Sequence, residues 1–433
     1  MRDLVLASQY KDSLITFATQ DLKGNINHRI LESDYNLEIL NSNNKKELVK
    51  LIQKLDINLL IIDHYQITYK EEKYIKDKTD VKILCFDDTY EKHHCDIVLN
   101  HNISADKLKY KNLVPKSCKL KCGSRFTLLR EEFYQQKNKI KKQNSSKIKN
   151  IFLSMGGSDP TNLNLKILKI LSKFENIKIN LITTSANQNI KKLQKYIKNK
   201  AWVKLHIDST QIAKLMRKND FAIIPPSVTA NEIYFMEIPF IAIKTASNQE
   251  DIYQFLKKKK YDVLQKFDKK RLQQLIKKRI NLASLKLRKV KADDRDFLYK
   301  LVNDKDVRKN SIHSDIITYK NHKKWFQSKI KQIKNKNCKI YILMLNKKRV
   351  AQIRLDKEDD VWIIDLSLDE KFRGYGFAHK MLKLLQNKLQ DETLVAYVKN
   401  TNIASKRLFE NFSFVKTKES KGLSFYRYKI GEG

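Results

Sequence analysis

The stretch IFLSMGGSDPTN (residues 151–162) decides the fold of the middle of the chain. It opens with a short apolar run that is typical of a buried strand, and Gly156-Gly157 then breaks the run. Ser158 or Asp159 is suited to cap a helix, and the proline that follows fits a first helical turn. The stretch therefore predicts a strand, a tight glycine turn and the start of a helix, which is the repeating unit of a parallel α/β sheet.

This glycine turn also has the features of a phosphate-binding site. Paired glycines let a backbone approach a ligand closely, and the free N–H groups at a helix start attract a diphosphate. Two later strands end in the polar turns PPSVTANEIYF (225–235) and TASNQED (245–251). A carboxylate such as Glu232 can accept hydrogen bonds from both ribose hydroxyls, and amide side chains can bind a pyrimidine edge or a sugar. The nucleotide-sugar site predicted from the three turns consists of Gly156, Gly157, Ser158, Asp159, Ser227, Asn231, Glu232, Asn248 and Gln249. The alternative is that these residues only cap helices.

The front of the chain shows the same alternation of strands and helices. Residues 57–65, 81–88 and 95–102 are buried-strand runs, and residues 45–55 have helical spacing. We therefore expect a parallel, doubly wound sheet, in which ligands bind beyond the carboxyl ends of the strands. The polar residues expected at those ends are Asp63, His64, Tyr65, Asp87, Asp88 and Asn100.

The pattern of elements changes twice along the chain. Residues 135–150 are basic and poor in apolar side chains, which predicts a connector between two lobes. From about residue 284, three strands (339–345, 349–356 and 361–369) follow one another, as in an antiparallel meander. A helix, a strand, a second helix and a hairpin complete this part. The predicted domains are 1–140, 150–280 and 284–433.

The back part carries a second glycine motif, in LDEKFRGYGFAHKMLKLL (368–385). Backbone N–H groups of such a turn at a helix start can hold a pyrophosphate. The spacing Arg-Gly-Tyr-Gly-Phe-Ala and the downstream NIASKRLFENFSF (402–414) are similar to the two motifs of the GNAT superfamily of N-acetyltransferases. The resemblance implies an α+β fold and acetyl-CoA as co-substrate. The acetyl-CoA-binding residues that it implies are Leu366, Leu368, Arg373, Gly374, Tyr375, Gly376, Phe377, Ala378, Asn402 and Ser405.

Acetyl transfer from a thioester to an amine needs a base for the amine proton and an acid for the leaving thiolate. Asp365, inside the third strand of the meander, is the candidate base, and the alternative is an exposed strand residue without a role. Many relatives use a tyrosine as the acid where this chain has Phe409, which cannot donate a proton. Tyr375, Tyr397 and Tyr426 remain as alternatives for that role.

The first ~280 residues resemble the family of UDP-2,4-diacetamido-2,4,6-trideoxy-β-L-altropyranose hydrolases of pseudaminic acid biosynthesis. The resemblance lies in RDLVLA, LLIIDHY, VKILCFDD, HHCDIVLN, LREEFYQ, MGGSD, IAKLM and NEI. It implies two Rossmann-like lobes of the glycosyltransferase-B type, with UDP held in the second lobe. It also implies that Tyr65, in DHY, faces the sugar, and that the reaction releases UDP and a free 6-deoxysugar.

The resemblance has one departure, at the start of the chain. In the family, a first strand and a glycine-rich loop containing Gly-His precede RDLVLA, and that histidine is the proposed base for water. The expectation is therefore an incomplete first lobe, with the first strand missing and the catalytic histidine absent. His28, His64, His93, His94 and His101 remain, and His64 lies nearest to the expected cleft.

Composition limits the other function classes. The net charge of +40 comes mostly from lysines spread along the whole chain, without the aromatic–arginine pattern of RNA-binding proteins, so no nucleic-acid partner is expected. The apolar runs are far shorter than the ~18 residues of a membrane span. No signal-peptide pattern opens the chain, and we expect a cytoplasmic protein. The five cysteines lack a Cys-x-x-Cys pair, so buried thiols are expected rather than a metal site.

Together these patterns predict a bifunctional enzyme of a UDP-sugar pathway. The back domain would acetylate a UDP-4-amino-4,6-dideoxy sugar with acetyl-CoA, and the front lobes would hydrolyse the resulting diacetamido product. The alternative is an acetyltransferase that carries a UDP-sugar-binding module without hydrolytic activity. A third option, an acetyltransferase associated with nucleic acid, would require salt-sensitive binding to nucleic acid. The patterns leave the oligomeric state open.

Overall fold

The computed structural model describes residues 2–23, 25–139 and 148–430. The described parts of residues 1–143 and 149–273 form one compact unit, and those of 144–148 and 274–433 form a second. Each unit is described by itself. The domain boundaries predicted from the sequence stay predictions. None of the helices within the described ranges combines the length and apolar character needed to cross a membrane.

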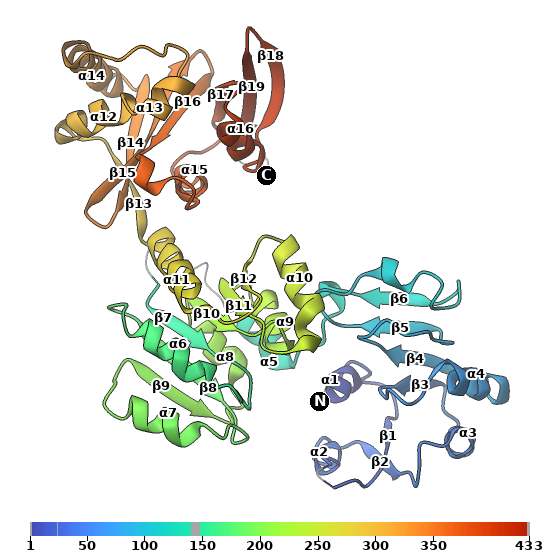
Figure 1. The fold of residues 1–433 in the computed structure, drawn as a ribbon. Coiled ribbons are helices and arrows are strands. Elements are labelled where there is room, and N and C mark those ends of the chain that lie inside the picture. The colour runs from blue at the N-terminus through green and yellow to red at the C-terminus, as the bar shows by residue number, and fades with distance from the viewer. Residues whose placement is uncertain (1, 24, 140–147, 431–433) are drawn as a thin grey trace. The chain divides into compact units, whose positions relative to one another are not determined.

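The second lobe of the first unit is built on a six-stranded parallel sheet with the order β12-β11-β10-β7-β8-β9 (Figure 1). Its elements are β7 (Asn150–Leu153), α6 (Leu163–Leu171), β8 (Lys178–Thr183), α7 (Ile190–Ile197), β9 (Val203–Ile207), α8 (Ile212–Arg217), β10 (Phe221–Ile224), α9 (Val228–Phe235), β11 (Phe240–Ile243), α10 (Glu250–Lys258) and β12 (Asp262–Leu264). The chain first builds outward from β7 to β9 and then returns to place β10 on the other side of β7. This is the doubly wound order, and its switch point lies between β7 and β10.

The first lobe carries two separate parallel sheets. Its elements are α1 (Arg2–Ala7), β1 (Thr16–Thr19), α2 (His28–Leu31), β2 (Asn36–Ile39), α3 (Lys45–Lys54), β3 (Leu59–Ile62), α4 (Tyr69–Lys78), β4 (Lys82–Phe86), β5 (Ile97–Asn100), β6 (Lys119–Cys122) and α5 (Glu131–Lys137). One sheet pairs β1 with β2, and the other has the order β3-β4-β5-β6. All strand pairs described in this lobe are parallel, as predicted, and β3 to β6 follow one another in chain order.

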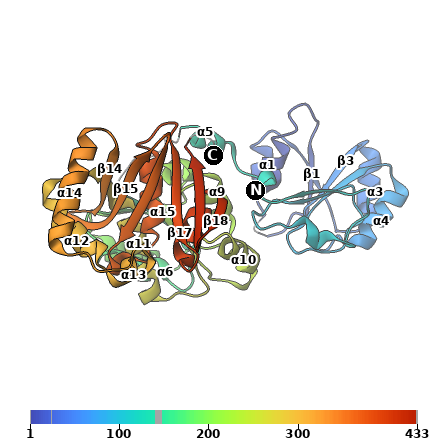
Figure 2. The ribbon, with the colours of Figure 1, turned by 90° about the horizontal axis from the view of Figure 1, so that it is seen from above.

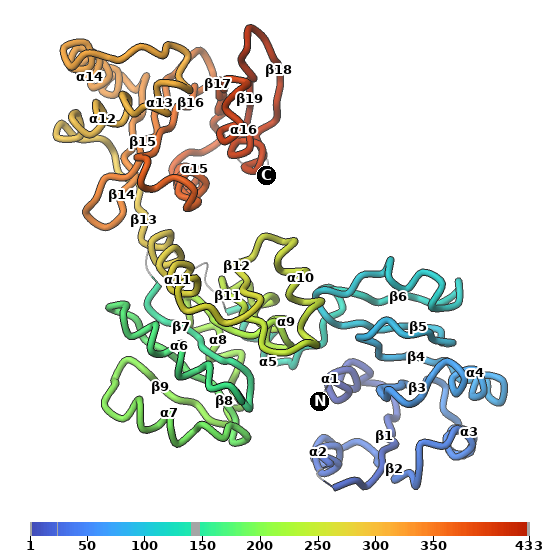
Figure 3. The backbone as a smooth tube through the Cα atoms, in the orientation of Figure 1, coloured from blue at the N-terminus to red at the C-terminus, as the bar shows by residue number. Residues whose placement is uncertain are grey.

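The second unit is an α+β fold around one seven-stranded sheet with the order β13-β14-β15-β16-β17-β19-β18. Its elements are β13 (Leu285–Lys289), α12 (Arg295–Val302), α13 (Lys305–Asn310), α14 (Tyr319–Lys334), β14 (Cys338–Leu345), β15 (Lys348–Glu358), β16 (Val361–Leu368), α15 (Phe377–Gln386), β17 (Thr393–Lys399), α16 (Ile403–Glu410), β18 (Val415–Ser420) and β19 (Leu423–Lys429), and α11 (Lys269–Ser284) leads into it. All neighbouring strands are antiparallel except the parallel pair β16–β17. Figure 3 lets the reader follow this path from β13 to β19.

The core of the second unit lies between the sheet and the helix α15. Ala351, Ile353 and Leu355 of β15 point to this side and pack with Phe377 and Met381 of α15. The alternate residues of β15 and β16 face the opposite side, because successive strand residues point to opposite faces. Figure 2 shows α12 and α14 at the β14–β15 end of the sheet.

Three details differ from the sequence-based expectations. Helix α6 begins at Leu163, so Pro160 precedes the helix instead of lying in its first turn. The reason is that Asp159 and Asn162 have positive φ angles (36° and 53°), which turn the chain before the helix starts. The composition of the lysine-rich residues 256–279 predicts a helix and a connector, whereas the structure also has a short strand there, β12. Residues 140–147 of the predicted connector (135–150) lie outside the described residues. Its first residues, 135–137, belong to α5.

Candidate functional site

The glycine turn after β7 presents free backbone N–H groups. Gly156 has φ 91°, a conformation that residues with a side chain rarely adopt. The carbonyl of Gly157 accepts hydrogen bonds from Thr183 Oγ1 (2.9 Å) and Thr184 N (3.2 Å), which fixes the turn against β8. Among the hydrogen bonds of the described residues, the amides of Gly156, Gly157 and Ser158 have no acceptor. Such a run of free amides is a binding site for an anionic group.

A second turn follows β10, the strand next to β7. Ser227 precedes the first turn of α9, and its side chain makes no capping hydrogen bond. Because β7 and β10 are paired, the turns after them lie at the same sheet edge and at the switch point. The structure thus places Ser227 beside the glycine turn, where parallel α/β sheets bind nucleotides.

Three other predicted nucleotide-binding side chains are buried and already hydrogen-bonded. The carboxylate of Asp159 accepts from the amides of Leu163 (2.8 Å) and Asn164 (2.9 Å) and so caps α6. Asn231 joins the two lobes, since its Oδ1 accepts from Ile103 N at 3.2 Å and its Nδ2 donates to Asn102.

Gln249 is the third of these side chains, and its Oε1 accepts from Thr245 N (2.8 Å). Gln249 and Asn248 lie in a 3₁₀ turn before α10, not in the expected loop. The predicted nucleotide contacts of Asp159, Asn231, Asn248 and Gln249 stay predictions.

Glu232 is the ionisable group with the most unusual environment near the switch point. Burial raises its pKa to about 7, against the opposing effect of the Arg130 charge. The guanidinium of Arg130 lies 3.9 Å from Glu232 Oε1 and 2.8 Å from Glu132 Oε1. A carboxyl with this pKa exchanges its proton near neutral pH, and so it can donate or accept a hydrogen bond. Sequence reasoning missed Arg130 because it lies far from Glu232 along the chain.

Tyr65 stands at the carboxyl end of β3, with its ring 74% exposed. Its hydroxyl donates to Asp88 Oδ1 (3.0 Å), and Asp88 also pairs with Arg2 (3.3 Å). Arg2 binds Asp63, so residues after β3 and β4 are tied to α1. Burial and the Asp88 charge raise the pKa of Tyr65, and the phenol is therefore a hydrogen-bond donor at neutral pH and not a base.

The histidines at this edge of the first lobe have different surroundings. His64 Nδ1 accepts from Gln66 N (3.2 Å), and this side chain is exposed. His101 is buried, its Nδ1 has no hydrogen-bond partner, and burial together with the Arg2 charge lowers its pKa to about 4. His101 is therefore neutral at physiological pH.

In the second unit, strands β16 and β17 are paired at one end and diverge toward the other. They pair only from Val361 to Ile363, although β16 continues to Leu368 and β17 to Lys399. The backbone groups of Leu366 that face β17 are therefore not taken up by β17, and they are available to a ligand that carries amide groups. The carbonyl of Leu368 accepts hydrogen bonds from Arg373 instead. This opening holds the predicted acetyl-CoA positions of β16.

The second glycine turn lies directly beyond this opening. Gly374 and Gly376 have φ 77° and 80°, and Gly376 is the N-cap of α15. Arg373 is held by Asp304 and Asp306 (2.7 Å) of the α13 region and by the carbonyl of Leu368. The turn thus presents the N-terminal amides of α15 beside the end of β16, as an anion-binding turn requires.

The remaining predicted acetyl-CoA positions belong to two helix starts. Phe377 is buried in the core below α15, and Ala378 follows it in the first helical turn, while Tyr375 is half exposed. The side chain of Asn402 accepts from Ser405 N (3.1 Å) and caps α16.

Asp365 lies on the face of the sheet that carries α12 and α14. Its carboxylate accepts from Gln352 Nε2 (2.9 Å), which also donates to Ser367 Oγ (3.2 Å). Arg354, opposite Asp365 in the register, lies 3.7 Å away. Gln352, Ser367 and Arg354 were not predicted, although strand alternation places them on the same face as Asp365.

The structure separates the three candidate tyrosines. Tyr426 is fully buried and donates to Glu410 Oε1 (2.9 Å), and burial raises its pKa to about 12. The hydroxyl of Tyr426 therefore keeps its proton inside the core, where its ring stacks on the buried Phe409. Tyr375 and Tyr397 are 50% and 37% exposed, and they remain as candidate acids.

Comparisons with known proteins place both units. Residues 284–415 match the family described as "Acetyltransferase (GNAT) domain". In the N-terminal part, the UDP-2,4-diacetamido-2,4,6-trideoxy-β-L-altropyranose hydrolase of Campylobacter jejuni is 44% identical over 266 residues, which cover 61% of this chain and 93% of that protein.

Two further comparisons concern more distant proteins. An uncharacterized protein of Methanocaldococcus jannaschii is 24% identical over 436 residues, covering 89% of this chain and 87% of its own. The structure of spermidine N-acetyltransferase from Vibrio cholerae, in complex with CoA and spermine, covers 34% of this chain and 96% of its own, with 13% identity and a TM-score of 0.31.

Proposed function

This chain belongs to the UDP-2,4-diacetamido-2,4,6-trideoxy-β-L-altropyranose hydrolase family and carries a GNAT acetyltransferase domain behind it, and we propose that it performs two consecutive reactions on one UDP-sugar. The acetyltransferase domain transfers an acetyl group from acetyl-CoA to the amino group of a UDP-4-amino-4,6-dideoxy sugar. The hydrolase part then releases UDP and the free 2,4-diacetamido-2,4,6-trideoxy sugar. Both reactions belong to pseudaminic acid biosynthesis, and neither uses a metal.

The observation that supports the proposal is the presence of a hydrolase-family part and an acetyltransferase domain in one chain. The substrate named for the Campylobacter jejuni relative carries two acetamido groups. An acetamido group forms when an amine attacks an acetyl thioester, which is the reaction of an N-acetyltransferase. The second unit therefore supplies the chemistry that completes the substrate of the first.

For the hydrolase reaction, we assign the pyrophosphate of UDP to the free amides of Gly156, Gly157 and Ser158 and to the start of α9. Glu232, with its pKa of about 7, is the partner for the ribose hydroxyls. Tyr65 faces the sugar from the first lobe, and its oxygen accepts a hydrogen bond from the sugar while its proton goes to Asp88. The helix-start amides stabilise the charge that develops on the leaving diphosphate.

For the acetyl transfer, we assign the backbone groups at the end of β16 to the pantetheine arm and the Gly374–Gly376 turn to the pyrophosphate of CoA. Asp365 is the base that receives the amine proton, directly or through a water molecule. Gln352 holds the carboxylate in place. The co-substrates, acetyl-CoA and a UDP-sugar, place the reaction in the cytoplasm.

A second candidate function is a chain that binds the UDP-sugar and acetylates it without hydrolysing it. It is favoured by the histidines described at the strand ends of the first lobe. His93 Nδ1 is hydrogen-bonded to Glu72 (2.7 Å), and His101 is buried with its ring edge-on to that of Phe86, whereas His64 is exposed.

The two candidates are separated by an assay of the full chain with acetyl-CoA and a UDP-4-amino-4,6-dideoxy sugar. Free CoA thiol and free UDP are measured in the same reaction. The two-step function predicts release of both. CoA release without UDP release supports the second candidate. Acetylation of a protein N-terminus, with no turnover of the sugar, would contradict both.

A further inference from the structure

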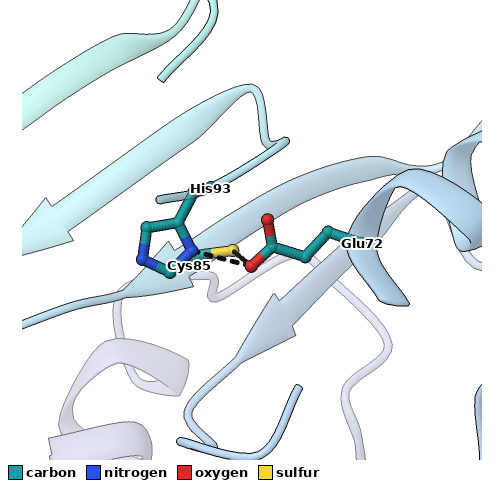
Figure 4. Close-up of side chains that lie close together, drawn as sticks. All are labelled: Glu72, Cys85 and His93. Atoms are coloured by element: carbon teal, nitrogen blue, oxygen red, sulfur yellow. Dashed lines mark hydrogen bonds and ion pairs between the residues drawn. The ribbon is translucent and has the colours of Figure 1, made fainter. Parts of the chain in front are cut away.

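Glu72, Cys85 and His93 bring three different metal-binding groups together inside the first lobe (Figure 4). Glu72 comes from α4, Cys85 from β4, and His93 from the loop between β4 and β5. Their ligand atoms all lie within 4.8 Å of one another. The sequence shows no metal motif because the fold, and not the spacing along the chain, assembles this group.

The distances within the group suit a small cation. Glu72 Oε1 lies 3.3 Å from Cys85 Sγ and 2.7 Å from His93 Nδ1. Zinc binds sulfur at about 2.3 Å and oxygen or nitrogen at about 2.0–2.2 Å, so tetrahedral ligand atoms stand roughly 3.3–3.8 Å apart. To make room for an ion between the three atoms, the histidine ring has to move away from Glu72 by about 1 Å or less.

The group is enclosed by protein. Glu72, Cys85 and His93 are 0%, 1% and 8% exposed. His93 Nε2 has no hydrogen-bond partner, and Asp87 Oδ2 lies 3.7 Å from it. A carboxylate beside the second ring nitrogen is the usual outer partner of a metal-binding histidine, because it fixes the ring and raises its basicity.

We propose that Glu72, Cys85 and His93 bind a zinc ion that holds α4, β4 and the loop before β5 together. Thiolate, imidazole and carboxylate together are a zinc donor set, whereas Mg²⁺ and Ca²⁺ take oxygen ligands. The site is structural and takes no part in the proposed reactions. It anchors the loop in which Asp87 accepts hydrogen bonds from Thr89, Tyr90 and Glu91 amides.

The test is the zinc affinity of the full chain after removal of metal with a chelator. Zn²⁺ is titrated in competition with a chromophoric chelator, and Co²⁺ is bound separately as a spectroscopic probe. We expect one zinc ion per chain, and a thiolate-to-cobalt charge-transfer band with the visible bands of a tetrahedral site. The cobalt spectra are recorded on the unaltered chain, so this part of the test does not depend on the folding of any variant.

The variants are Cys85→Ser and His93→Gln, with Cys338→Ser as the control. Cys338 is an equally buried thiol in the second unit, and it interacts with Asp356 instead of with this group. We expect zinc binding to weaken more than ~10-fold in the first two variants and to stay unchanged in the control. An unaltered chain that binds no zinc against the chelator would overturn the proposal, and so would a Cys85→Ser variant with unchanged affinity.

Discussion

Gly157 shows how one residue sets the shape of the phosphate turn. A Cβ atom added there would lie 2.9 Å from Thr184 Oγ1, so the turn and β8 approach too closely for any side chain. The same contact brings the Gly157 carbonyl to Thr183 and leaves the neighbouring amides free. The absence of a side chain is therefore a condition for the geometry that we assign to UDP binding.

Gly157→Ala is expected to weaken UDP binding, because the added methyl group displaces the turn from Thr184. Isothermal titration with UDP checks this. Thr184→Ala, which removes Oγ1 and Cγ2, is expected to restore part of the affinity in the double variant. Thr184→Ala alone is the control. Equal UDP affinity for Gly157→Ala and the unaltered chain would show that the turn does not hold the diphosphate.

Glu232 is a buried carboxyl whose ionisation opposes folding. Its pKa of about 7 in the folded chain lies above the ordinary value of 4.5. The cost of its charge is therefore absent below about pH 4.5, grows between the two pKa values, and is fully present above about pH 7.

Glu232→Gln removes that cost. Its free energy of unfolding in urea is expected to exceed that of the unaltered chain at pH 8, by an amount on the order of 1–3 kcal/mol, and to match it near pH 5. Glu237→Gln, on the exposed residue that follows α9, is the matched control and should show no such pH dependence. A stability difference that is the same at both pH values would argue against a raised pKa.

Asp365→Asn tests the base of the acetyl transfer. The amide keeps the size of the side chain but cannot accept the amine proton, and kcat is expected to fall ~10²-fold or more while the KM for acetyl-CoA stays the same. Ser367→Ala, which removes the neighbouring hydroxyl from Gln352, is the control for disturbance of the same face. An unchanged kcat in Asp365→Asn would remove Asp365 from the mechanism.

At the scale of elements, we assign acetyl-CoA to the opening between β16 and β17 together with the turn before α15. Both depend on main-chain groups: the unpaired end of β16 and the N-terminal amides of α15. The turn needs Gly374 and Gly376 because both have positive φ. The motif in the sequence indicated this turn, but the opening between the strands emerged only from their register.

Gly376→Ala places a side chain at φ 80°, where a Cβ atom would only touch Leu282 at 4.0 Å. The strain, about 1–2 kcal/mol, shifts the turn, and the KM for acetyl-CoA is expected to rise. Gly422→Ala is the matched control, because Gly422 has φ 75° and no neighbour within 4 Å. A similar KM in both variants would mean that the α15 turn does not bind the co-substrate.

Element types were predictable where apolar runs were regular, as in β7, β10 and the meander β14–β16. The roles of side chains were less predictable, because one residue type can serve in more than one way. Asp159 has the residue type of a phosphate-binding turn and of a helix cap, and its hydrogen bonds to Leu163 and Asn164 show the second use. Pairs such as Glu232 with Arg130 depend on tertiary contacts, which periodicity does not reveal.

At the scale of the whole molecule, two compact units share one chain, and each has its own glycine turn, to which we assign a diphosphate. One unit belongs to a hydrolase family, and the other contains an acetyltransferase domain. The proposed order of reactions follows from the chemistry, since the diacetamido sugar exists only after acetylation. We therefore propose that the units act in sequence on one substrate.

The separate glycine turns allow the two steps to be uncoupled. In Gly157→Ala we expect CoA release to continue while UDP release falls, so that the acetylated UDP-sugar accumulates. In Gly376→Ala, UDP release from the amino sugar should fall together with CoA release, while hydrolysis of added diacetamido sugar continues. Mass spectrometry of the sugar products distinguishes these patterns, and loss of both steps in each variant would contradict independent sites.

The central claim is tested most directly by one time course. The purified full chain is mixed with acetyl-CoA and a UDP-4-amino-4,6-dideoxy sugar, and CoA thiol and UDP are measured together. The two-step account predicts that CoA appears first and that UDP follows to an equal final amount, with no UDP formed when acetyl-CoA is left out. UDP release that does not depend on acetyl-CoA, or no CoA release from this sugar, would contradict it.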